Sequence, residues 1–465
     1  MLCDFEECKR GVREVIESAE ETLDYSTFIC DPEVRLPSWD GREEKTFGTL
    51  IQEACGRGVE VTIAYNPASC YGNLSEAEFV AAVAPARVVS IRGSLGPAPW
   101  MLYFSNNASW SYHHQKYAVA DGGAKIMVTG CDLNGERAGW LELNAVGYYW
   151  HELGALMELS PGPERDAVGA WVRANTLGGV DTAPEAIPPP PLVQHASEAD
   201  IMRTLIAESK TSIHLENQSF MSGWGSKNGI AGAIVDRVVR AVAEGQIGFR
   251  VLILTNMAQQ DEPSFMTRLY CSASLLWSIR YMERMAGAAG VSLSQFYDHV
   301  FIGYMEHEGV LVKVHSNILI VDSSVAIRSS SNLSDRCLSE FPTDSELGLL
   351  VTQGVAEFES RLFSMYLGVE GTTVSVSTAF AAAKQGHGVF RSVDQSLRRT
   401  PDVLNDALVS FLQSTPATGG QEPTFFTATP GGAGVPVAEP KSVPVVWMAV
   451  AVVIVVVALL MMMLP

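Results

Sequence analysis

Two stretches of the chain share one pattern, His114-Gln115-Lys116-Tyr117-Ala118-Val119-Ala120-Asp121 and His315-Ser316-Asn317-Ile318-Leu319-Ile320-Val321-Asp322. Both begin with histidine and end with aspartate, but the first has lysine at its third position and the second has asparagine. The apolar middle of each stretch is typical of a β-strand, in which residues two apart point to the same face. His114 and Lys116 therefore present together an imidazole that can attack phosphorus and a cation suited to phosphate oxygens.

The second copy adds another imidazole, His315, which is suited to protonating a leaving alkoxide. A single copy could arise by chance or mark a histidine buried in a core. Each copy is followed, however, by a second apolar strand and a turn of small residues, at 126–133 and 325–333, and then by an acidic residue that leads into an apolar run. A repeat of this length predicts two similar lobes, each of which contributes half of one site.

These features resemble the signature of the phospholipase D superfamily, a duplicated HxKxxxxD pattern followed by a small-residue turn with Asn or Asp. The resemblance runs over about residues 30–350. It is most specific to eukaryotic and plant phospholipases D in four stretches: His113-His114-Gln115-Lys116, Gly130-Cys131-Asp132-Leu133, Trp150-His151-Glu152 and Leu215-Glu216-Asn217-Gln218-Ser219-Phe220. It implies an α/β fold of two similar lobes packed about a pseudo-twofold axis, across which the two histidines face each other.

The resemblance also implies roles for individual residues. His114 would be the nucleophile that forms a phosphohistidine, and His315 would be the general acid for the departing alcohol and then the base for water. Lys116, Asp132 and Asn332 would hold phosphate oxygens. The family needs no metal for this chemistry, so no cofactor is expected.

The remaining candidate catalytic residues are acidic or stand in the second motif. Glu152 and Glu346 occupy positions whose carboxylates orient the two histidines in the family, although a solvated surface charge is the alternative for each. Asp121 and Asp322 end the two motifs. Asn317 stands at the lysine position of the second motif.

The chain departs from the family at three positions near the phosphate. Asn317 removes a positive charge, and the loss of one transition-state donor typically costs about a hundredfold to a thousandfold in rate. Ser329 and Cys131 stand where the family has glycines, which permit positive φ and close approach. Arg328 would restore the missing cation if its side chain pointed inward, although a solvated arginine at a strand end is the more common case.

The composition excludes some function classes. The net charge of −20 argues against a general nucleic-acid binder, whose phosphate contacts need a basic surface, and the chain has no polybasic patch for acidic lipids. A zwitterionic membrane phospholipid is therefore the expected substrate. The eight cysteines form no CxxC pair, which favours reduced thiols in the cytosol over disulfides.

Residues 443–464 form an uncharged apolar run that is long enough to cross a bilayer as a helix. A buried soluble helix is the alternative, but such a helix rarely stays uncharged over this length. We expect a C-terminal transmembrane anchor with only Pro465 beyond it, no secretory leader at the N-terminus, and a catalytic body that faces the cytosol. The sequence does not indicate the organelle.

The predicted organisation has five parts. They are a first lobe at 1–180, a proline-rich connector at 181–196, a second lobe at 197–413, a flexible linker at 414–442 and the transmembrane anchor at 443–464. Within the lobes, helical spacing at 164–175 and 197–210 and strand patterns at 59–65, 213–215 and 249–254 predict an α/β layer fold.

We therefore expect a membrane-anchored phosphodiesterase of the phospholipase D type, which hydrolyses or transphosphatidylates glycerophospholipids. One alternative is a lipid-binding or membrane-remodelling relative, in which Asn317 marks lost turnover while the phosphate pocket persists. Another is a phosphodiesterase that acts on nucleic acid, as some members of the superfamily do, although the acidity of the chain argues against it.

Overall fold

The computed structural model describes residues 1–65, 75–91, 113–134, 139–143, 149–178, 188–223, 226–256, 265–334, 337–339, 344–369 and 371–393. All of them belong to one compact unit, Met1–Ala428. Within these ranges, no helix combines the length and the apolar character needed to cross a bilayer. The predicted linker at 414–442, the predicted anchor at 443–464 and the first part of the predicted connector, 181–187, lie outside the described residues.

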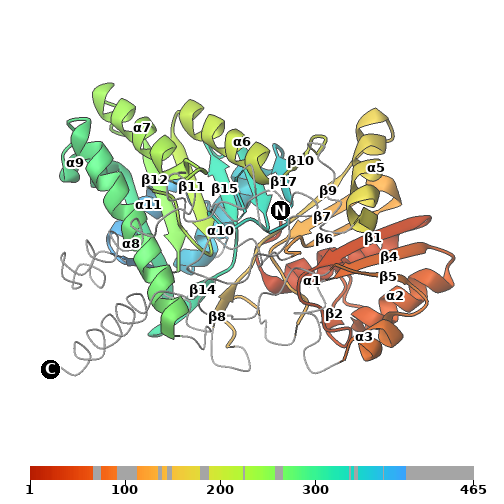
Figure 1. Ribbon diagram of the computed structural model, residues 1–465. Helices are drawn as coiled ribbons and strands as arrows, with labels where there is room; N and C mark the ends of the chain where they lie inside the picture. The colour runs from red at the N-terminus through yellow and green to blue at the C-terminus, as the bar shows by residue number, and fades with distance from the viewer. Residues whose placement is uncertain are drawn as a thin grey trace, which may run out of the picture. The chain divides into compact units, whose positions relative to one another are not determined.

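The first part of the chain builds a six-stranded sheet (Figure 1). In spatial order its strands are β5 (Arg87–Ser90), β4 (Glu60–Tyr65), β1 (Thr22–Thr27), β6 (Tyr117–Ala120), β7 (Lys125–Thr129) and β9 (Gly154–Glu158). Strand β1 is parallel to β4 and antiparallel to β6, and β6, β7 and β9 are antiparallel to one another in turn. The first copy of the histidine motif therefore enters the sheet through β6.

The rest of the chain builds a ten-stranded sheet that repeats this order. In spatial order its strands are β10 (Leu192–Val193), β17 (Gly348–Val351), β16 (Val325–Ser329), β15 (Ile318–Val321), β11 (Ser212–Asn217), β12 (Arg250–Thr255), β13 (Val300–His307), β14 (Val310–Val314) and β8 (Tyr149–His151), with β18 (Phe390–Ser392) beside β13. Strand β11 is parallel to β12 and antiparallel to β15, and β15, β16 and β17 are antiparallel in turn. Strands β11, β12, β15, β16 and β17 thus correspond to β1, β4, β6, β7 and β9.

Strand β8 breaks the division between the two sheets. It comes from the same part of the chain as β7 and β9, yet it pairs in parallel with β14 of the larger sheet. The second copy of the histidine motif follows β14 directly, so β8 brings Glu152 beside that copy. A short ribbon of β2 (Arg35–Leu36) and β3 (Lys45–Thr46) completes the strands of the described ranges.

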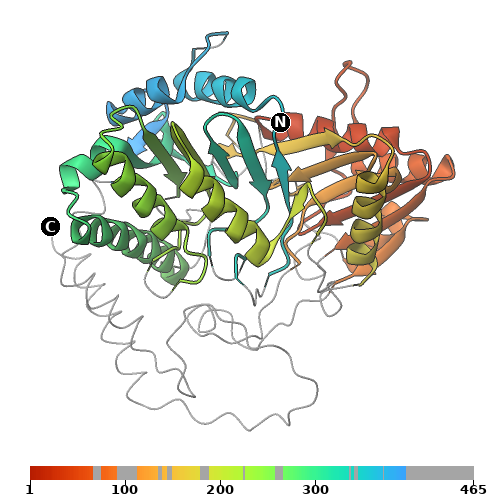
Figure 2. The same cartoon turned by 90° about the horizontal axis from the view of Figure 1, so that it is seen from above.

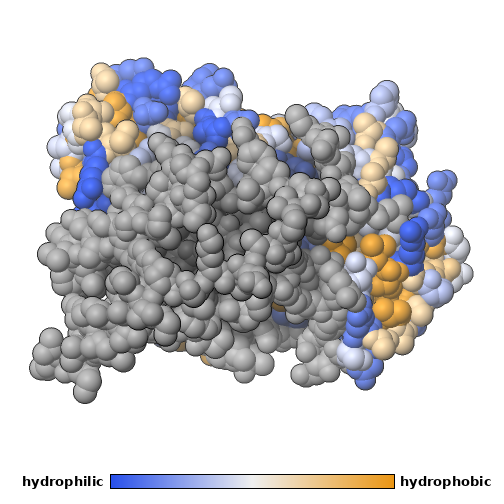
Figure 3. All heavy atoms as spheres, in the orientation of Figure 1, coloured by the Kyte–Doolittle hydropathy of each residue, from blue (hydrophilic) through white to orange (hydrophobic). Residues whose placement is uncertain are grey.

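Helices lie on both sides of each sheet (Figures 1 and 2). They are α1 (Phe5–Ser18), α2 (Phe47–Gly56), α3 (Glu76–Val83), α5 (Pro163–Gly178), α6 (His195–Glu208), α7 (Ile230–Ala243), α8 (Phe265–Ala288), α9 (Leu293–His299), α10 (Val355–Leu367) and α11 (Val376–Lys384), with a 3-10 turn η1 (Asp121–Gly123). Helices α1 to α3 share one apolar core with the smaller sheet, and α6 to α9 share another with the larger sheet. Hydrophilic side chains are prominent on the outward surface of α6 and α7 (Figure 3).

A third apolar core joins the two sheets through α5, α10 and α11. Strand β12 shows how the sequence serves two cores at once. Val251 and Ile253 pack with the α6 to α9 core, whereas Leu252 and Leu254 pack with the core that joins the sheets. A strand buried on both faces needs a continuous apolar run, which is the pattern that predicted it.

The structure confirms the mixed α/β class and the individual elements that the sequence predicts. The predicted helices at 164–175 and 197–210 are α5 and α6, and the predicted strands at 59–65, 213–215 and 249–254 are β4, β11 and β12. The boundaries differ by a few residues at most of these ends. Helix ends and strand ends are set by capping and pairing contacts that hydropathy does not encode.

The aspartates that end the two motifs have equivalent structural contacts. Asp121 has a φ of 50°, and its carboxylate accepts hydrogen bonds from the backbone amides of Glu20, Glu21 and Thr22. Asp322 has a φ of 53°, and its carboxylate accepts from the backbone amides of 210, 211 and 212. Each aspartate thus fixes the chain that leads into the central strand of its sheet, β1 or β11.

The pKa of Asp322 is lowered in the folded protein. Burial by itself raises the pKa, but the amides of residues 211, 212 and 210 outweigh burial. A carboxylate with a depressed pKa stabilises the fold above its unfolded-state pKa, and this contribution is lost as the pH falls through the folded-state pKa.

We therefore expect Asp322→Ala to lower the free energy of unfolding by about 2–3 kcal/mol near neutral pH, because hydrogen bonds to a charged acceptor contribute about 1.5–3 kcal/mol. Urea denaturation followed by circular dichroism measures this. The gap between wild type and variant should narrow below about pH 4. Asp298→Ala, at an exposed position of α9, is the control and should change stability by less than about 0.5 kcal/mol. A gap that is absent at neutral pH would contradict this role of Asp322.

Candidate active site

His114 lies just before β6 and is held by the segment that leads into β17. Its backbone amide donates to the carbonyl of Ser345 at 3.0 Å. Its Nδ1 lies 3.0 Å from both carboxylate oxygens of Glu346. Its ring packs edge-on against Phe28, with the ring centroids 5.1 Å apart. The imidazole side chain is 13 % exposed, whereas the carboxylate is fully buried.

His315 has the same contacts with the chain halves exchanged. Its backbone amide donates to the carbonyl of His151 at 2.9 Å, and its Nδ1 lies 2.9 Å from Glu152 Oε1. Its ring packs edge-on against Trp150, with the centroids 5.3 Å apart. Each histidine is therefore positioned by a carboxylate that belongs to the other copy of the repeat.

The carboxylate fixes which nitrogen of each ring carries out chemistry. Burial by itself would raise the pKa of Glu346, but the neighbouring His114 and Lys116 outweigh burial and hold its pKa below the usual range. An ionised carboxylate can only accept hydrogen bonds, so Nδ1 of His114 carries the proton. Nε2 is then the nitrogen left for a substrate, and the carboxylate stabilises the ring when it becomes positive.

The two histidine segments meet at the turns that follow β7 and β16. Gly130 donates its amide to Leu153, and the equivalent Ser330 donates its amide to Leu347. A Cβ on Gly130 would lie 2.9 Å from the carbonyl oxygen of His315 and 3.2 Å from Glu152 Oε2. Gly130 is therefore required by the close approach of the second motif to the first turn.

Lys116 is buried beside the first turn. Its Nζ donates to the carbonyl of His114 at 3.0 Å and lies 3.7 Å from Asp132 Oδ1. It also lies above the ring of Phe28, 5.2 Å from the centroid. Asp132 in turn accepts from the amide of Ile29 at 3.1 Å. The lysine and the aspartate thus stand next to the first histidine, where a phosphate oxygen and its counter-charges would be placed.

The side-chain amide of Asn317 is hydrogen-bonded to the backbone at both ends. Its Nδ2 donates to the carbonyl of Ser330 at 3.0 Å, and its Oδ1 accepts from the amide of Gln218 at 3.1 Å. Both ends of the amide are therefore engaged with the backbone. Asn332, at the second turn, has a buried Oδ1 for which the described residues provide no hydrogen-bond partner.

The structure does not bring Asp121 or Asp322 to this cluster. Strands β1 and β6 are antiparallel, so Asp121 lies beside the first residue of β1, whereas His114 packs on Phe28 beyond the last. Asp322 is related to β11 and His315 in the same way. Their contacts are structural, and the catalytic role expected for the motif aspartates gains no support from the geometry.

Two further expectations from the sequence are corrected. Cys131 and Ser329 replace family glycines, but neither has a positive φ in the structure, so glycine is not required for the backbone at either position. Arg328 is not a solvated arginine at a strand end, because its side chain is fully buried. An arginine has a long apolar stem and a charged end, so from sequence alone a side chain at the end of β16 could point either to solvent or into the core.

Several residues of the site were not predicted. Ser330 Oγ donates to Glu346 Oε2 at 2.5 Å. His195 Nε2 accepts from the amide of Glu346 at 3.3 Å, and burial lowers the pKa of this histidine, which keeps it neutral. His195 also has a φ of 51°, a conformation that a non-glycine residue adopts at a cost. These residues hold Glu346 toward His114.

A buried network lies behind the second histidine, centred on Glu216. The Glu216 carboxylate contacts four buried side chains, which belong to His151, His214, Ser316 and Tyr366. Burial by itself would lower the pKa of His214, but Glu216 and Glu359 outweigh it and raise the pKa to about 9. His151 precedes Glu152 and Ser316 follows His315, so the network fixes both backbones of that pair. The sequence offered one indication that Glu216 is important, because it lies in the Leu215-Glu216-Asn217-Gln218 stretch that resembles eukaryotic and plant phospholipases D.

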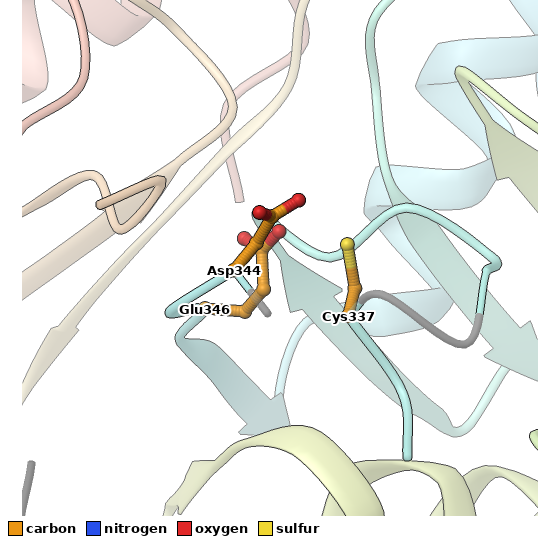
Figure 4. Close-up of side chains that lie close together, drawn as sticks. All are labelled: Cys337, Asp344 and Glu346. Carbon is orange, nitrogen blue, oxygen red and sulfur yellow. The ribbon is translucent and has the colours of Figure 1, made fainter. Parts of the chain in front are cut away.

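Cys337, Asp344 and Glu346 offer ligand atoms within 4.8 Å of one another (Figure 4). A metal would need the thiolate of Cys337, but burial, together with the two carboxylates, raises the pKa of this thiol well above its usual range. Glu346 is already engaged with His114. The donor chemistry therefore fits a metal ion poorly, and we assign none to this cluster.

Comparison with known proteins identifies relatives of the chain. No family model matches it. Phospholipase D zeta 1 of Arabidopsis thaliana is 30 % identical over 174 residues, which are 32 % of this chain and 15 % of that protein. Phospholipase D of Phytophthora infestans is 27 % identical over 212 residues, which are 37 % of this chain and 12 % of that protein. Phospholipase D B of Dictyostelium discoideum is 31 % identical over 166 residues, which are 32 % of this chain and 13 % of that protein. The matches thus span under a sixth of each relative.

Two solved structures are similar to the chain at low sequence identity. Phosphatidylserine synthase of Haemophilus influenzae Rd KW20 is 12 % identical, with 88 % of this chain and 91 % of that chain covered and a TM-score of 0.46. Yeast tyrosyl-DNA phosphodiesterase is 12 % identical, with 71 % and 84 % covered and a TM-score of 0.39. Taken with the duplicated motif, the sequence matches confirm that the chain resembles the phospholipase D superfamily.

Proposed function

We propose that the protein is a phosphodiesterase that cleaves membrane glycerophospholipids by the phospholipase D reaction. The similarity of the chain to phospholipases D supports a phosphodiesterase-type function. The observation that carries the proposal is the reciprocal pairing of two imidazoles with two buried carboxylates, His114 with Glu346 and His315 with Glu152. Two similar lobes related by an approximate twofold axis would produce this pairing, and a single phosphodiester would lie between the two rings.

In the proposed reaction, Nε2 of His114 attacks phosphorus while the bond from phosphorus to the head-group oxygen breaks. His315 gives its proton to the departing alkoxide, and the phosphatidyl group stays on His114. His315 then takes a proton from water or from a primary alcohol, whose oxygen attacks phosphorus and releases His114. Lys116 would hold a phosphate oxygen, and Glu346 and Glu152 would stabilise whichever ring is positive.

The lipid substrate rests on the sequence matches to phospholipases D and on the acidity of the chain. A net charge of −20 disfavours polyanionic nucleic acid. The engaged amide of Asn317 favours a second candidate function, in which the site binds a phospholipid without turning it over. Turnover by the purified protein separates the two candidates.

Phosphatidylcholine with a primary alcohol tests the reaction. We expect the protein to form the phosphatidylalcohol, and His114→Ala to abolish its formation because the nucleophile is lost. His387→Ala, at an exposed position after α11, is the matched control and should retain full activity. Equal product from the His114 variant would overturn the mechanism. Binding of phosphatidylcholine vesicles without product would favour the non-enzymatic candidate, and degradation of single-stranded DNA would favour the nuclease.

The carboxylates can be tested by the steady-state rate of the same reaction. Glu346→Gln and Glu152→Gln keep the size of each side chain but remove the charge that stabilises the imidazolium. We expect kcat to fall roughly 10²- to 10⁴-fold in either variant, with a smaller change in KM. Glu357→Gln, at an exposed position of α10, should leave kcat unchanged. A variant that melts at the wild-type temperature yet keeps its kcat would show that the pairing is only structural.

We also propose that residues 443–464 anchor the protein in a membrane, with the catalytic body in the cytosol. The support is the uncharged apolar composition of this run. Val453→Lys with Val456→Lys should move the protein from the membrane pellet to the supernatant, because each lysine at the centre of a spanning helix costs about 2.5–3.5 kcal/mol. The same change at Val435 and Val437, in the predicted linker, is the matched control. Retention of the first variant in a carbonate-washed pellet would contradict the anchor.

A further inference from the structure

Arg328 is a charged residue in the core at the junction of the two sheets. It lies on β16, and its side chain is 0 % exposed. Its Nε donates to the carbonyl of Leu153 at 2.9 Å, and its Nη1 donates to the carbonyl of Asn317 at 2.8 Å and also to that of Ser329. The guanidinium therefore lies directly against the residue that replaces lysine in the second motif.

The free end of the guanidinium points toward the histidine site. Nη2 is buried, and the described residues provide no hydrogen-bond partner for it. A Cβ on Gly130 would collide with Nη2, and the same position is 2.9 Å from the carbonyl oxygen of His315 and 3.2 Å from Glu152 Oε2. The charge of Arg328 is therefore placed beside the first turn, the second histidine and the carboxylate that orients it.

The two repeats carry their cations at different positions. The amide of Thr129 donates to the carbonyl of Lys116, and the amide of Ser329 donates to the carbonyl of Asn317, so β7 and β16 have the same register on their motif strands. Val128 and Arg328 are therefore equivalent positions. The first repeat has lysine with valine and the second has asparagine with arginine, so each repeat contributes one cation from one of the two paired positions.

The charge balance of the cluster explains why a second cation is needed. Glu346, Glu152 and Asp132 are buried acidic groups near the two histidines, and a phosphodiester adds another negative charge. Lys116 alone would leave this cluster strongly negative when both rings are neutral. An arginine keeps its charge even in a core, and its field is screened less there than at the surface.

We infer that Arg328 supplies the second positive charge of the phosphate site and so compensates for Asn317. The inference rests on the proposed function, because it assumes that the site holds a phosphodiester. Arg328 acts through space and through the backbone of the second motif, as a positioning and electrostatic residue. Burying a charge that no other group compensates costs free energy. If Arg328 only filled space, an apolar side chain of similar size could replace it without loss of stability.

The test uses the full chain and two independent measurements. Binding of inorganic phosphate by calorimetry reports the charge of the site, and turnover of phosphatidylcholine reports the reaction. The variants are Arg328→Met, Asn317→Lys and the two combined. Arg237→Met is the matched control, because Arg237 is also buried and also bonds to backbone carbonyls, but it lies on α7 against Ser209 and Lys210.

We expect Arg328→Met to weaken phosphate binding at least about tenfold and to lower turnover about a hundredfold, because a preorganised charge in a buried site stabilises the negative charge of the transition state. The double variant should recover most of both losses, because a lysine at 317 can follow the course that Lys116 takes in the first repeat. Asn317→Lys alone should gain less than about tenfold, since a second cation is already present. Arg237→Met should alter stability but not phosphate binding.

Four outcomes would overturn the inference. They are unchanged phosphate binding in a folded Arg328→Met, failure of Asn317→Lys to rescue it, a gain of about a hundredfold from Asn317→Lys alone, and no phosphate binding by the wild type. If Arg328→Met does not fold, the turnover of Asn317→Lys alone tests the inference, because a gain of less than about tenfold supports it and a gain of about a hundredfold overturns it. Phosphate binding that depends on Arg328 in a protein without lipid turnover would sink the proposed function and keep this inference. Lipid turnover that is the same in wild type and in Arg328→Met would keep the proposed function and overturn this inference.

Discussion

A carboxylate from one copy of the repeat lies against the histidine of the other copy, and this contact occurs twice. Much of the architecture of the described residues follows from the need to hold these two pairs. The segments that carry the carboxylates are tied by backbone hydrogen bonds to the segments that carry the histidines, at Ser345 and at His151. Behind them, Ser330 and His195 fix Glu346, and the Glu216 network fixes the neighbours of Glu152 and His315.

The two pairs are held by different means, although the strand order around them is the same. Glu346 is supported by a hydroxyl and a neutral imidazole. Glu152 is instead close to the buried guanidinium of Arg328, and its neighbour His151 belongs to the buried network that holds Glu216 and Glu359. The electrostatic surroundings of the two histidines therefore differ. A difference of this kind can give two chemically identical rings separate roles, one as nucleophile and one as acid, because the ring with the lower proton affinity gives up its proton more readily.

Local features of the fold were accessible from the sequence. The apolar runs of β12 and β15 and the spacing of α5 and α6 encode their own secondary structure, because burial on one or two faces dictates where apolar residues fall. The repeat also indicated that His114 and His315 belong to one site. What the sequence could not show was which carboxylate serves which histidine, since Glu152 is nearer in sequence to His114 but contacts His315. That exchange depends on packing between distant segments.

The sequence was also a poor guide to the surroundings of individual polar side chains. Asp121 and Asp322 stand in a motif rich in catalytic residues, but a carboxylate that accepts several backbone amides is a structural anchor, and only coordinates reveal those amides. A charged residue at a strand end is usually exposed, and only the packing of the two sheets against each other shows that Arg328 is buried. Both cases involve polar residues, for which hydropathy carries little information about depth.

Strand β8 has a consequence for how the protein must be assembled. It is made before the larger sheet exists, and its pairing partner β14 is separated from it by most of that sheet in sequence. Until β14 is available, this strand has no place in its own sheet and presents unpaired backbone groups. The first repeat therefore relies on the second for the partner of β8, and Glu152, which follows that strand, lies beside His315 only when both repeats are present.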